Sequence, residues 1–291
     1  MKHSIARDIS YASSARTRRG KLLVRGLEAL TGRHSLLLRA KGYDQAIGQG
    51  AIFWEEMAQR YGLQLEVLRG TLDMIPSTGP VVVVANHPYG ILDGLILSLL
   101  LSRTRGADGF KVIANDVFLR APDLANVILP VNFDETRAAQ AINLQMRKTA
   151  LAYLAGGGAV GVFPGGAVST PARPFGPAKD PYWRGFSAKL IRQSGATVVP
   201  IHFEGANSRL FQLASHLHST LRLGLFVREF RARTDGPVRL SVGTPISPQE
   251  IAAHPGNQSE LMDWLRGRTY AAGGDDAELG FDWDTQKAGC T

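Results

Sequence analysis

The sequence contains very little cysteine and no long apolar run, and each absence excludes a class of protein. Cys290 is the single cysteine among 291 residues. An intramolecular disulfide and a cysteine-based metal site are therefore excluded, and a reducing compartment is expected. The best candidate for a membrane span, residues 90–102, is shorter than the roughly 20 apolar residues that a span needs. Charged residues interrupt every apolar run near the N-terminus, so a signal peptide is not expected.

Acidic residues are scarce at the N-terminus, where positive charge is concentrated. Residues 1–41 contain ten Lys and Arg but only Asp8 and Glu28 as acids, whereas the rest of the chain has 23 residues of each sign. The whole net charge of +8 therefore lies in this segment. Leucines alternate with the charges, which is typical of amphipathic helices on an anionic membrane surface. A solvated basic helix packed on the domain explains the same pattern.

Nucleic acid is not expected as a partner of this basic segment. Tyr11 is its single aromatic residue, so it has no platform on which bases could stack.

The rest of the chain predicts one α/β domain. Strand patterns alternate with helix patterns, and "VVVVAN" at residues 81–86 is typical of a strand buried on both faces. We expect a single domain with a mostly parallel or mixed central sheet, flanked by helices and preceded by basic amphipathic N-terminal helices. The predicted regions are a docking segment at 1–45, the domain at 46–270, and a flexible tail rich in Gly and Asp at 271–291.

The expected elements follow from periodicity and turn residues. Strands are predicted at 63–70, 81–86, 110–115, 128–131, 159–164, 196–205 and 238–243, and helices at 46–61, 92–103, 116–127, 135–154, 182–193, 209–233 and 248–268, the last with Ser247 as its N-cap. Pro200 lies within a predicted strand, which indicates an edge strand or a bulge.

A glycine-rich stretch, "GGGAVG", matches the spacing of a dinucleotide-binding loop through Gly156, Gly158 and Gly161. That loop needs a strand before it and a helix after it, so that the phosphate meets the helix N-terminus. Here the predicted order is the reverse. The stretch is therefore interpreted as a helix C-cap and turn.

His87 and Asp93 are the residues best placed for chemistry. His87 directly follows a predicted buried strand, at the end where α/β sheets bind their ligands, and Asp93 falls in the first turn of the next helix. A carboxylate there can orient an imidazole that removes a proton from a hydroxyl. The alternative is that both residues only cap their elements. Since the sequence has no Gly-x-Ser-x-Gly nucleophile, such a base would activate the substrate's own hydroxyl.

"ANHPYGILDGLIL" resembles the first conserved block of the glycerolipid acyltransferase superfamily, which begins with Asn-His and ends in Asp. The block usually has four residues between His and Asp. The spacing of five residues seen here resembles that of one branch of the superfamily, which contains haemolysin-like proteins and lyso-ornithine-lipid O-acyltransferases. The resemblance implies that His87 is the catalytic base, that Asp93 orients it, and that Asn86 lies at the substrate.

Three further blocks follow in the family's order. "NDVFLRAPDL" resembles the second block and implies that Arg120 binds the acceptor's phosphate or carboxylate; a structural ion pair is the alternative. "VFPGGAVST" resembles the third block, but Gly165 replaces its glutamate. Gly165, Gly166 and Ser169 are then a candidate anion-binding nest, or a plain turn. "VVPIHFEGANSRLF" resembles the fourth block and adds Asn207, while His202 is interpreted as a strand histidine.

The resemblance implies transfer of a fatty acyl group from acyl-CoA or acyl carrier protein to the hydroxyl of a lyso-lipid or glycerol phosphate. The N–H groups that open the helix, from Gly90 to Gly94, are the predicted oxyanion donors. No metal ion and no further cofactor are expected. The expected location is the cytoplasm, peripheral on the inner face of the cytoplasmic membrane, with the basic segment on anionic lipid or an acidic carrier protein.

Two other functions are compatible with the same residues. An acyl thioester hydrolase would use water in place of the acceptor. A non-catalytic lipid-binding, membrane-associated protein is the second alternative, because the third-block glutamate is missing.

Overall fold

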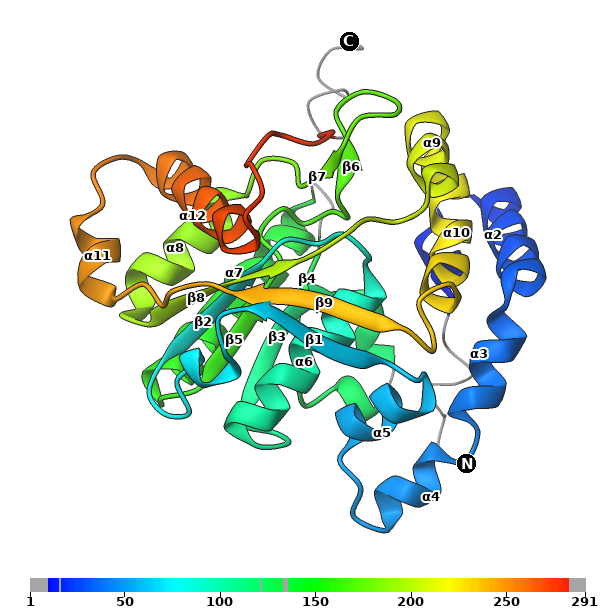
Figure 1. Ribbon diagram of the computed structural model, residues 1–291, viewed down its shortest axis with the longest axis horizontal. Helices are drawn as coiled ribbons and strands as arrows, with labels where there is room; N and C mark the ends of the chain where they lie inside the picture. Colours follow the sequence, from blue (N-terminus) through cyan, green and yellow to red (C-terminus); the bar gives the residue numbers. More distant parts are fainter. Residues whose placement is uncertain (1–9, 16, 121, 133–135, 283–291) are drawn as a thin grey trace.

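The computed structural model describes residues 10–15, 17–120, 122–132 and 136–282, and a twisted central sheet runs through it (Figure 1). The seven strands of this sheet lie in the order β1-β9-β8-β2-β5-β3-β4. Their bounds are β1 (Gln64–Arg69), β2 (Val81–Ala85), β3 (Phe110–Asn115), β4 (Ile128–Val131), β5 (Ala159–Val162), β8 (Thr197–Phe203) and β9 (Pro237–Val242). All neighbours pair in parallel except β8 and β9, which are antiparallel. The predicted α/β fold with a mostly parallel sheet is confirmed.

Strand β2 forms the wall between two hydrophobic cores. Every residue from Val81 to Ala85 is fully buried. Successive side chains of a strand point to opposite faces, and accordingly Val81, Val83 and Ala85 belong to one core while Val82 and Val84 belong to the other. The continuous β-branched run is therefore required by a strand that is covered on both faces.

Helices cover both faces of the sheet (Figure 1). The core that contains Val83 also includes residues of α3 (Arg33–Ala40), α4 (Tyr43–Gly48), α5 (Phe53–Arg60), α6 (Ile91–Arg105) and α10 (Ser219–Arg231). The core that contains Val82 includes residues of α7 (Arg137–Ala155), α8 (Gly185–Ser194), α11 (Pro248–Ala253) and α12 (Gln258–Gly273). A short hairpin of β6 (Thr170–Pro171) and β7 (Ala178–Lys179), which the sequence did not predict, lies outside the main sheet.

Several predicted helices are interrupted in the structure. The helix predicted at 248–268 is two helices, because Pro255 follows α11 and Gly256 takes a positive φ of 115°. The helix predicted at 209–233 is divided into α9 (Arg209–Leu217) and α10 at the extended residue His218. The segment predicted at 46–61 divides around Gly50, and that at 116–127 is two 3₁₀ helices, Asp116–Arg120 and Pro122–Leu124. Ser247 caps α11 as predicted, with Glu250 completing a capping box.

Two smaller predictions have different outcomes. Pro200 lies in an interior strand, not at an edge; its carbonyl accepts from the Gly243 N–H at 2.8 Å, at the point where the chain leaves β9. The missing N–H therefore faces an irregular stretch of backbone. The "GGGAVG" segment is a helix C-cap and turn as predicted, since Gly156 caps α7, Gly157 has a φ of 82° and β5 begins at Ala159.

The basic N-terminal segment packs on the domain through α2 (Arg18–Thr31). Helix α2 lies beside α10 (Figure 1), and the two backbones approach closely where Leu27 meets Gly224. A Cβ at Gly224 would lie 2.6 Å from the Leu27 Cδ1 atom. Glycine is therefore required at the crossing of these helices. Residues 1–9 and Arg16, which belong to the same predicted segment, lie outside the described residues.

The predicted start of a flexible tail at residue 271 does not match the structure. Ala271 to Gly273 complete α12, and the chain after them is fixed by contacts with the domain. Lys179 Nζ lies 2.5 Å from Asp275 Oδ1, and the Phe281 N–H donates to the Thr170 carbonyl at 2.9 Å. Residues 283–291 lie outside the described residues.

Candidate active site

The turns that follow β2, β5 and β8 meet at the carboxyl edge of the sheet. The His87 carbonyl accepts from the Ser169 N–H at 2.8 Å, which joins the turn after β2 to the segment after β5. Tyr89 Oη donates to the Glu204 carbonyl at 2.7 Å, which joins the same turn to the segment after β8. Parallel strands place the ends of their turns at one edge, where α/β proteins bind ligands. The first, third and fourth blocks singled out in the sequence are therefore brought together.

His87 and Asp93 form the predicted pair. Nδ1 of His87 lies 2.9 Å from Oδ2 of Asp93. The distance is that of a hydrogen bond, although the ring N–H is not aligned with the oxygen; such misalignment is common in sites without substrate. The ring stacks on Phe163, with centroids 4.2 Å apart. Because Nδ1 faces Asp93, Nε2 is the nitrogen that can take up a proton from a substrate hydroxyl.

Asp93 is a completely buried carboxylate. Its Oδ2 also accepts from the N–H groups of Tyr89 at 2.8 Å and Gly90 at 2.9 Å. Asp93 thus closes the turn before α6 as well as facing His87, so the capping interpretation holds, and the catalytic interpretation stays a prediction. Burial raises the pKa of the Asp93 carboxyl, and the contact with His87 together with the two backbone hydrogen bonds opposes the rise.

Asn86 has a structural task. Its Nδ2 donates to the Phe203 carbonyl at 2.9 Å, and its Oδ1 accepts from the Phe203 N–H at 2.7 Å. The side chain therefore fastens the end of β2 to the end of β8, one residue before His87. The predicted place of Asn86 at the substrate receives no support from these bonds.

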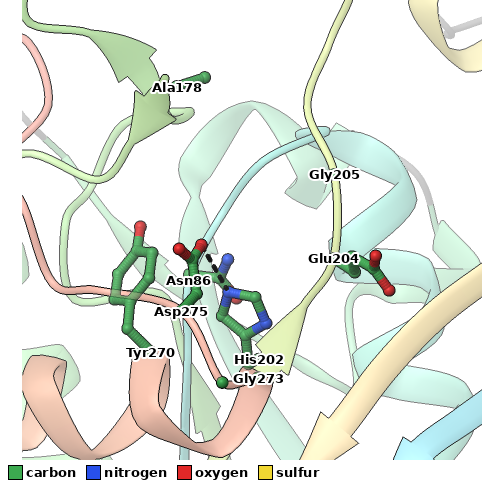
Figure 2. Close-up of a pocket in the computed structure, with 9 residues that line it drawn as sticks. Asn86, Ala178, His202, Glu204, Gly205, Tyr270, Gly273 and Asp275 are labelled. Atoms are coloured by element: carbon green, nitrogen blue, oxygen red, sulfur yellow. Dashed lines mark ion pairs between the residues drawn. The ribbon is translucent and has the colours of Figure 1, made fainter. Parts of the chain in front are cut away.

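A polar cavity of about 230 Å³ has Asn86 among its lining residues (Figure 2). His202, Glu204, Tyr270 and Asp275 line it. His202 is buried, its Nε2 is 3.9 Å from Asp275 Oδ2, and its ring packs edge-on against Tyr270. Burial lowers the pKa of His202 to about 4. The histidine is therefore neutral near pH 7, which agrees with its interpretation as a strand histidine.

Two of the backbone donors predicted for an oxyanion are already in use. The Gly90 N–H donates to Asp93, and the Gly94 N–H donates to the Gly90 carbonyl at 3.3 Å. These two groups are therefore occupied by the aspartate and the helix, and the role of the N–H groups between them stays a prediction. Gly90 matters instead through its φ of 86° and its close contact with Phe226, since a Cβ there would lie 3.0 Å from the ring.

The predicted nest after β5 is a turn. The Gly166 N–H donates to the Phe163 carbonyl at 3.0 Å, and Gly166 takes a positive φ of 64°, as the plain-turn alternative requires. The Ser169 N–H is bound by His87, and the Ser169 hydroxyl donates to Asp180 at 2.5 Å. Gly166 and Ser169 therefore do not offer these donors to an anion. Gly165 packs against Asp180, Pro181 and Trp183.

Among the predicted substrate contacts, Asn207 has a side-chain amide that forms no hydrogen bond within the described residues. It is 4% exposed, and its amide nitrogen and oxygen are both buried with no hydrogen-bond partner among the described residues. A buried polar group without a partner costs about 1 to 3 kcal/mol, so a function is expected to maintain it. Arg120 ends the 3₁₀ helix after β3, and its side chain lies outside the described part.

Asp180 is the residue that sequence reasoning missed. It follows the β6–β7 hairpin, is completely buried, and accepts the His87 N–H at 3.0 Å through Oδ1. It is 93 residues from His87 along the chain and belongs to none of the four blocks. No local pattern connects the two, since the contact depends on how the hairpin folds back over the sheet edge.

The family comparison decides the kind of protein. Residues 60–275 match the model of a family described as "Acyltransferase". The chain belongs to this acyltransferase family. The matched range includes His87, Asp93 and Asp180, and the resemblance to acyltransferases noted in the sequence is confirmed.

Two relatives share part of this acyltransferase sequence. Both are named lyso-glycine lipid O-acyltransferase: the protein of Phocaeicola vulgatus is 29% identical over 140 residues, and that of Bacteroides thetaiotaomicron is 32% identical over 142 residues. Each match covers 48% of this chain and, in the same order, 47% and 48% of the relative. The chain thus spans about half the length of the curated relatives it matches.

Among solved structures, the chain is similar to PlsC, the 1-acyl-sn-glycerophosphate (LPA) acyltransferase of Thermotoga maritima. The TM-score is 0.47 at 16% sequence identity, over 90% of this chain and 84% of that one. None of the helices in the described residues is long and apolar enough to cross a membrane.

Proposed function

We propose that this chain is a lyso-lipid O-acyltransferase that uses a fatty acyl thioester, on coenzyme A or acyl carrier protein, as its donor. The observation that carries the proposal is the contact of 2.9 Å between His87 and the buried Asp93 at the carboxyl edge of the sheet. The relatives named for lyso-glycine lipid acylation support a lyso-lipid as the acceptor.

The reaction needs one base and no covalent enzyme intermediate. Nε2 of His87 takes the proton of the acceptor hydroxyl as the oxygen attacks the thioester carbonyl, and Asp93 stabilises the imidazolium that forms. The carbon–sulfur bond of the tetrahedral intermediate then breaks, and the proton passes from His87 to the thiolate. The products are the O-acylated lipid and a free thiol, so atoms and protons balance.

Asn207 is the proposed contact for the acceptor. Its buried amide offers donors and an acceptor to a head group or an ester carbonyl at the sheet edge. Arg120, placed by the resemblance at the acceptor's phosphate or carboxylate, stays part of the proposal.

The proposal includes docking on an anionic membrane surface on the cytoplasmic side. Leu22 and Leu30 of α2 are 69% and 85% exposed, although the opposite side of the same helix is buried on the domain. Arg18, Arg19 and Lys21 lie beside Leu22 in sequence, and Arg33 lies three residues after Leu30. Basic residues beside exposed apolar side chains are typical of a helix that lies at the interface of an anionic bilayer.

The test is an assay of the purified chain with palmitoyl-CoA or palmitoyl carrier protein and a lyso-glycine or lyso-phospholipid acceptor. Free thiol and O-acylated product should appear together and in equal amounts. Thiol release with free fatty acid and without acceptor would show a thioester hydrolase. Lipid that co-purifies without any thiol release would show a non-catalytic binding protein, and either result would overturn the proposal.

A further inference from the structure

Asp180 holds the backbone of the catalytic turn with its carboxylate. Oδ1 accepts from the His87 N–H at 3.0 Å and from the Ser169 hydroxyl at 2.5 Å, and Oδ2 accepts from Trp183 Nε1 at 2.9 Å. A main-chain N–H and an indole N–H can only donate, so each oxygen faces an obligate donor. This set of partners suits an ionised carboxylate.

Asp180 is itself fixed by the C-terminal part of the fold. Its N–H donates to Tyr270 Oη of α12 at 2.8 Å, and its carbonyl accepts from the Gly280 N–H at 2.9 Å. Tyr270 is 1% exposed, so the anchor on α12 is part of the core. The carboxylate therefore cannot move toward a ligand without breaking contacts with two other segments.

The position of Asp180 accounts for the glycine that departs from the third block. A Cβ at Gly165 would lie 3.4 Å from Asp180 Oδ2 and 3.4 Å from Pro181 Cδ. A glutamate at this position would begin in contact with a buried carboxylate, and two like charges without water between them repel strongly. In this chain the carboxylate beside the turn that contains Gly165 comes from Asp180. Both of its oxygens accept hydrogen bonds from groups of the protein itself.

His87 thus has a buried carboxylate on either side. Asp93 faces its ring at 2.9 Å, and Asp180 binds its N–H. Tyr11 and Arg222 lie beyond Asp93, and Tyr270 lies beyond Asp180. Burial raises the pKa of Asp180, while the Ser169 and Trp183 hydrogen bonds, the His87 N–H and the nearby imidazole oppose the rise.

We infer that Asp180 is a positioning residue for His87: it fixes the turn that presents the ring, and its charge stabilises the imidazolium formed during acyl transfer. The inference rests on the proposed function for its catalytic part. Its geometric part, the hold on the His87 backbone, can be measured without any substrate.

The test compares Asp180→Asn with Glu229→Gln. Glu229 is also a buried carboxylate, but among the described residues its hydrogen bonds and ion pair are with Ser208 and Arg228, not with His87. In Asp180→Asn the amide must set a donor against either His87 N–H or Trp183 Nε1. We expect kcat to fall ~10- to ~100-fold, as for other small displacements of a catalytic group, with KM little changed. The acidic limb of the kcat profile should move to lower pH, by up to about one unit.

The substrate-free measurement follows His87 by NMR. In Asp180→Asn, the His87 amide proton and amide nitrogen should both lose their hydrogen-bonded chemical shifts. Both signals should stay in place in Glu229→Gln. A folded Asp180→Asn variant with unchanged signals and an unchanged pH profile would overturn the inference.

Two further outcomes remain interpretable. If the wild type transfers no acyl group but the NMR signals move as expected, the proposed function fails and the positioning role stands. If Asp180→Asn does not fold, Ser169→Ala removes one donor from Oδ1 and leaves the charge. It should shift the His87 amide resonance, and an unmoved resonance in that variant would contradict the inference.

Discussion

In the proposed mechanism, Asp93 uses the same oxygen atom for catalysis and for local structure. Its Oδ2 faces Nδ1 of His87 and also accepts two backbone N–H groups at the start of α6. The orientation of the imidazole is therefore tied to the first turn of the helix. Substitutions of the two residues should separate these tasks.

His87→Ala should abolish acyl transfer without unfolding the protein. General acid–base catalysis typically contributes ~100- to ~10,000-fold to the rate, and the ring is stacked on Phe163 near the surface of the domain, not at its centre. Thiol release with palmitoyl-CoA and a lyso-lipid measures the loss, and circular dichroism checks the fold. A folded variant with near-normal turnover would exclude the mechanism.

Asp93→Asn should lose activity but not stability. The Asn Oδ1 can still accept from the Tyr89 and Gly90 N–H groups, and the amide needs no buried charge. Because the folded-state pKa of Asp93 is raised, its ionisation disfavours the folded state once the pH exceeds the unfolded value near 4. At pH 7 the variant should therefore melt at the wild-type temperature or higher. A melting temperature many degrees lower would show that the charge itself is needed for folding.

The residues of the site differ in how far the sequence predicts them. His87 and Asp93 were predictable because a buried strand, a short turn and a helix place them together within seven residues. Asp180 was not, because its contact with His87 spans 93 residues. Asn86 belongs to the sequence pattern of the family. Its two hydrogen bonds to the Phe203 backbone, which join two strands, are visible only in the structure.

Among the secondary-structure elements, α2 has one face that packs on α10 and another that does not. Val24 is fully buried, and Leu27 meets Gly224 of α10, whereas Leu22 and Leu30 are exposed. Deleting residues 1–33 would therefore also uncover the domain. Point substitutions on the exposed face test membrane docking more cleanly.

The double variant Leu22→Ser/Leu30→Ser should bind vesicles of anionic phospholipid more weakly. Each leucine inserted into the bilayer contributes roughly 1.5 to 3 kcal/mol when fully buried, so the combined loss should be about tenfold or more. Co-sedimentation measures it. Leu68→Ser, at a half-exposed leucine of β1, is the matched control and should bind normally. Equal binding of the wild type and both variants would show that α2 packs on the domain without docking on the membrane.

The boundaries of the elements show where sequence reasoning stops. The break between α11 and α12 was readable from Pro255 and Gly256, but the apolar period on either side favoured one long helix. The hairpin of β6 and β7 has two residues in each strand. Elements this short have no periodicity to detect, so they appear only when the rest of the fold holds them.

At the scale of the whole molecule, buried titratable groups make stability depend on pH. Burial, opposed by Asp275 and aided by nearby Lys179 and Arg69, lowers the pKa of His202 to about 4. An unfolded histidine titrates near 6.5. Since the unfolded chain takes up this proton first, stability should fall as the pH drops from about 6.5 toward 4.

His202→Gln should remove part of this acid sensitivity. In the wild type, the lowered pKa of His202 should reduce the free energy of unfolding by about 3 kcal/mol at pH 4. Urea unfolding at pH 7.5 and pH 5 measures it, and the difference between the two conditions should be smaller in the variant. His34→Gln, at an exposed histidine, should behave as the wild type does. An identical pH difference in all three proteins would contradict the assignment.

The burial of β2 has a consequence for how the catalytic turn can move. Val81 to Ala85 belong alternately to both cores, and the turn with His87 begins one residue later, with Asn86 fastened to Phe203. A strand shared by two cores opens only when both cores open. Amide protons of β2 should therefore exchange with solvent only on global unfolding, and substrate entry should depend on the surrounding segments while the base stays in place.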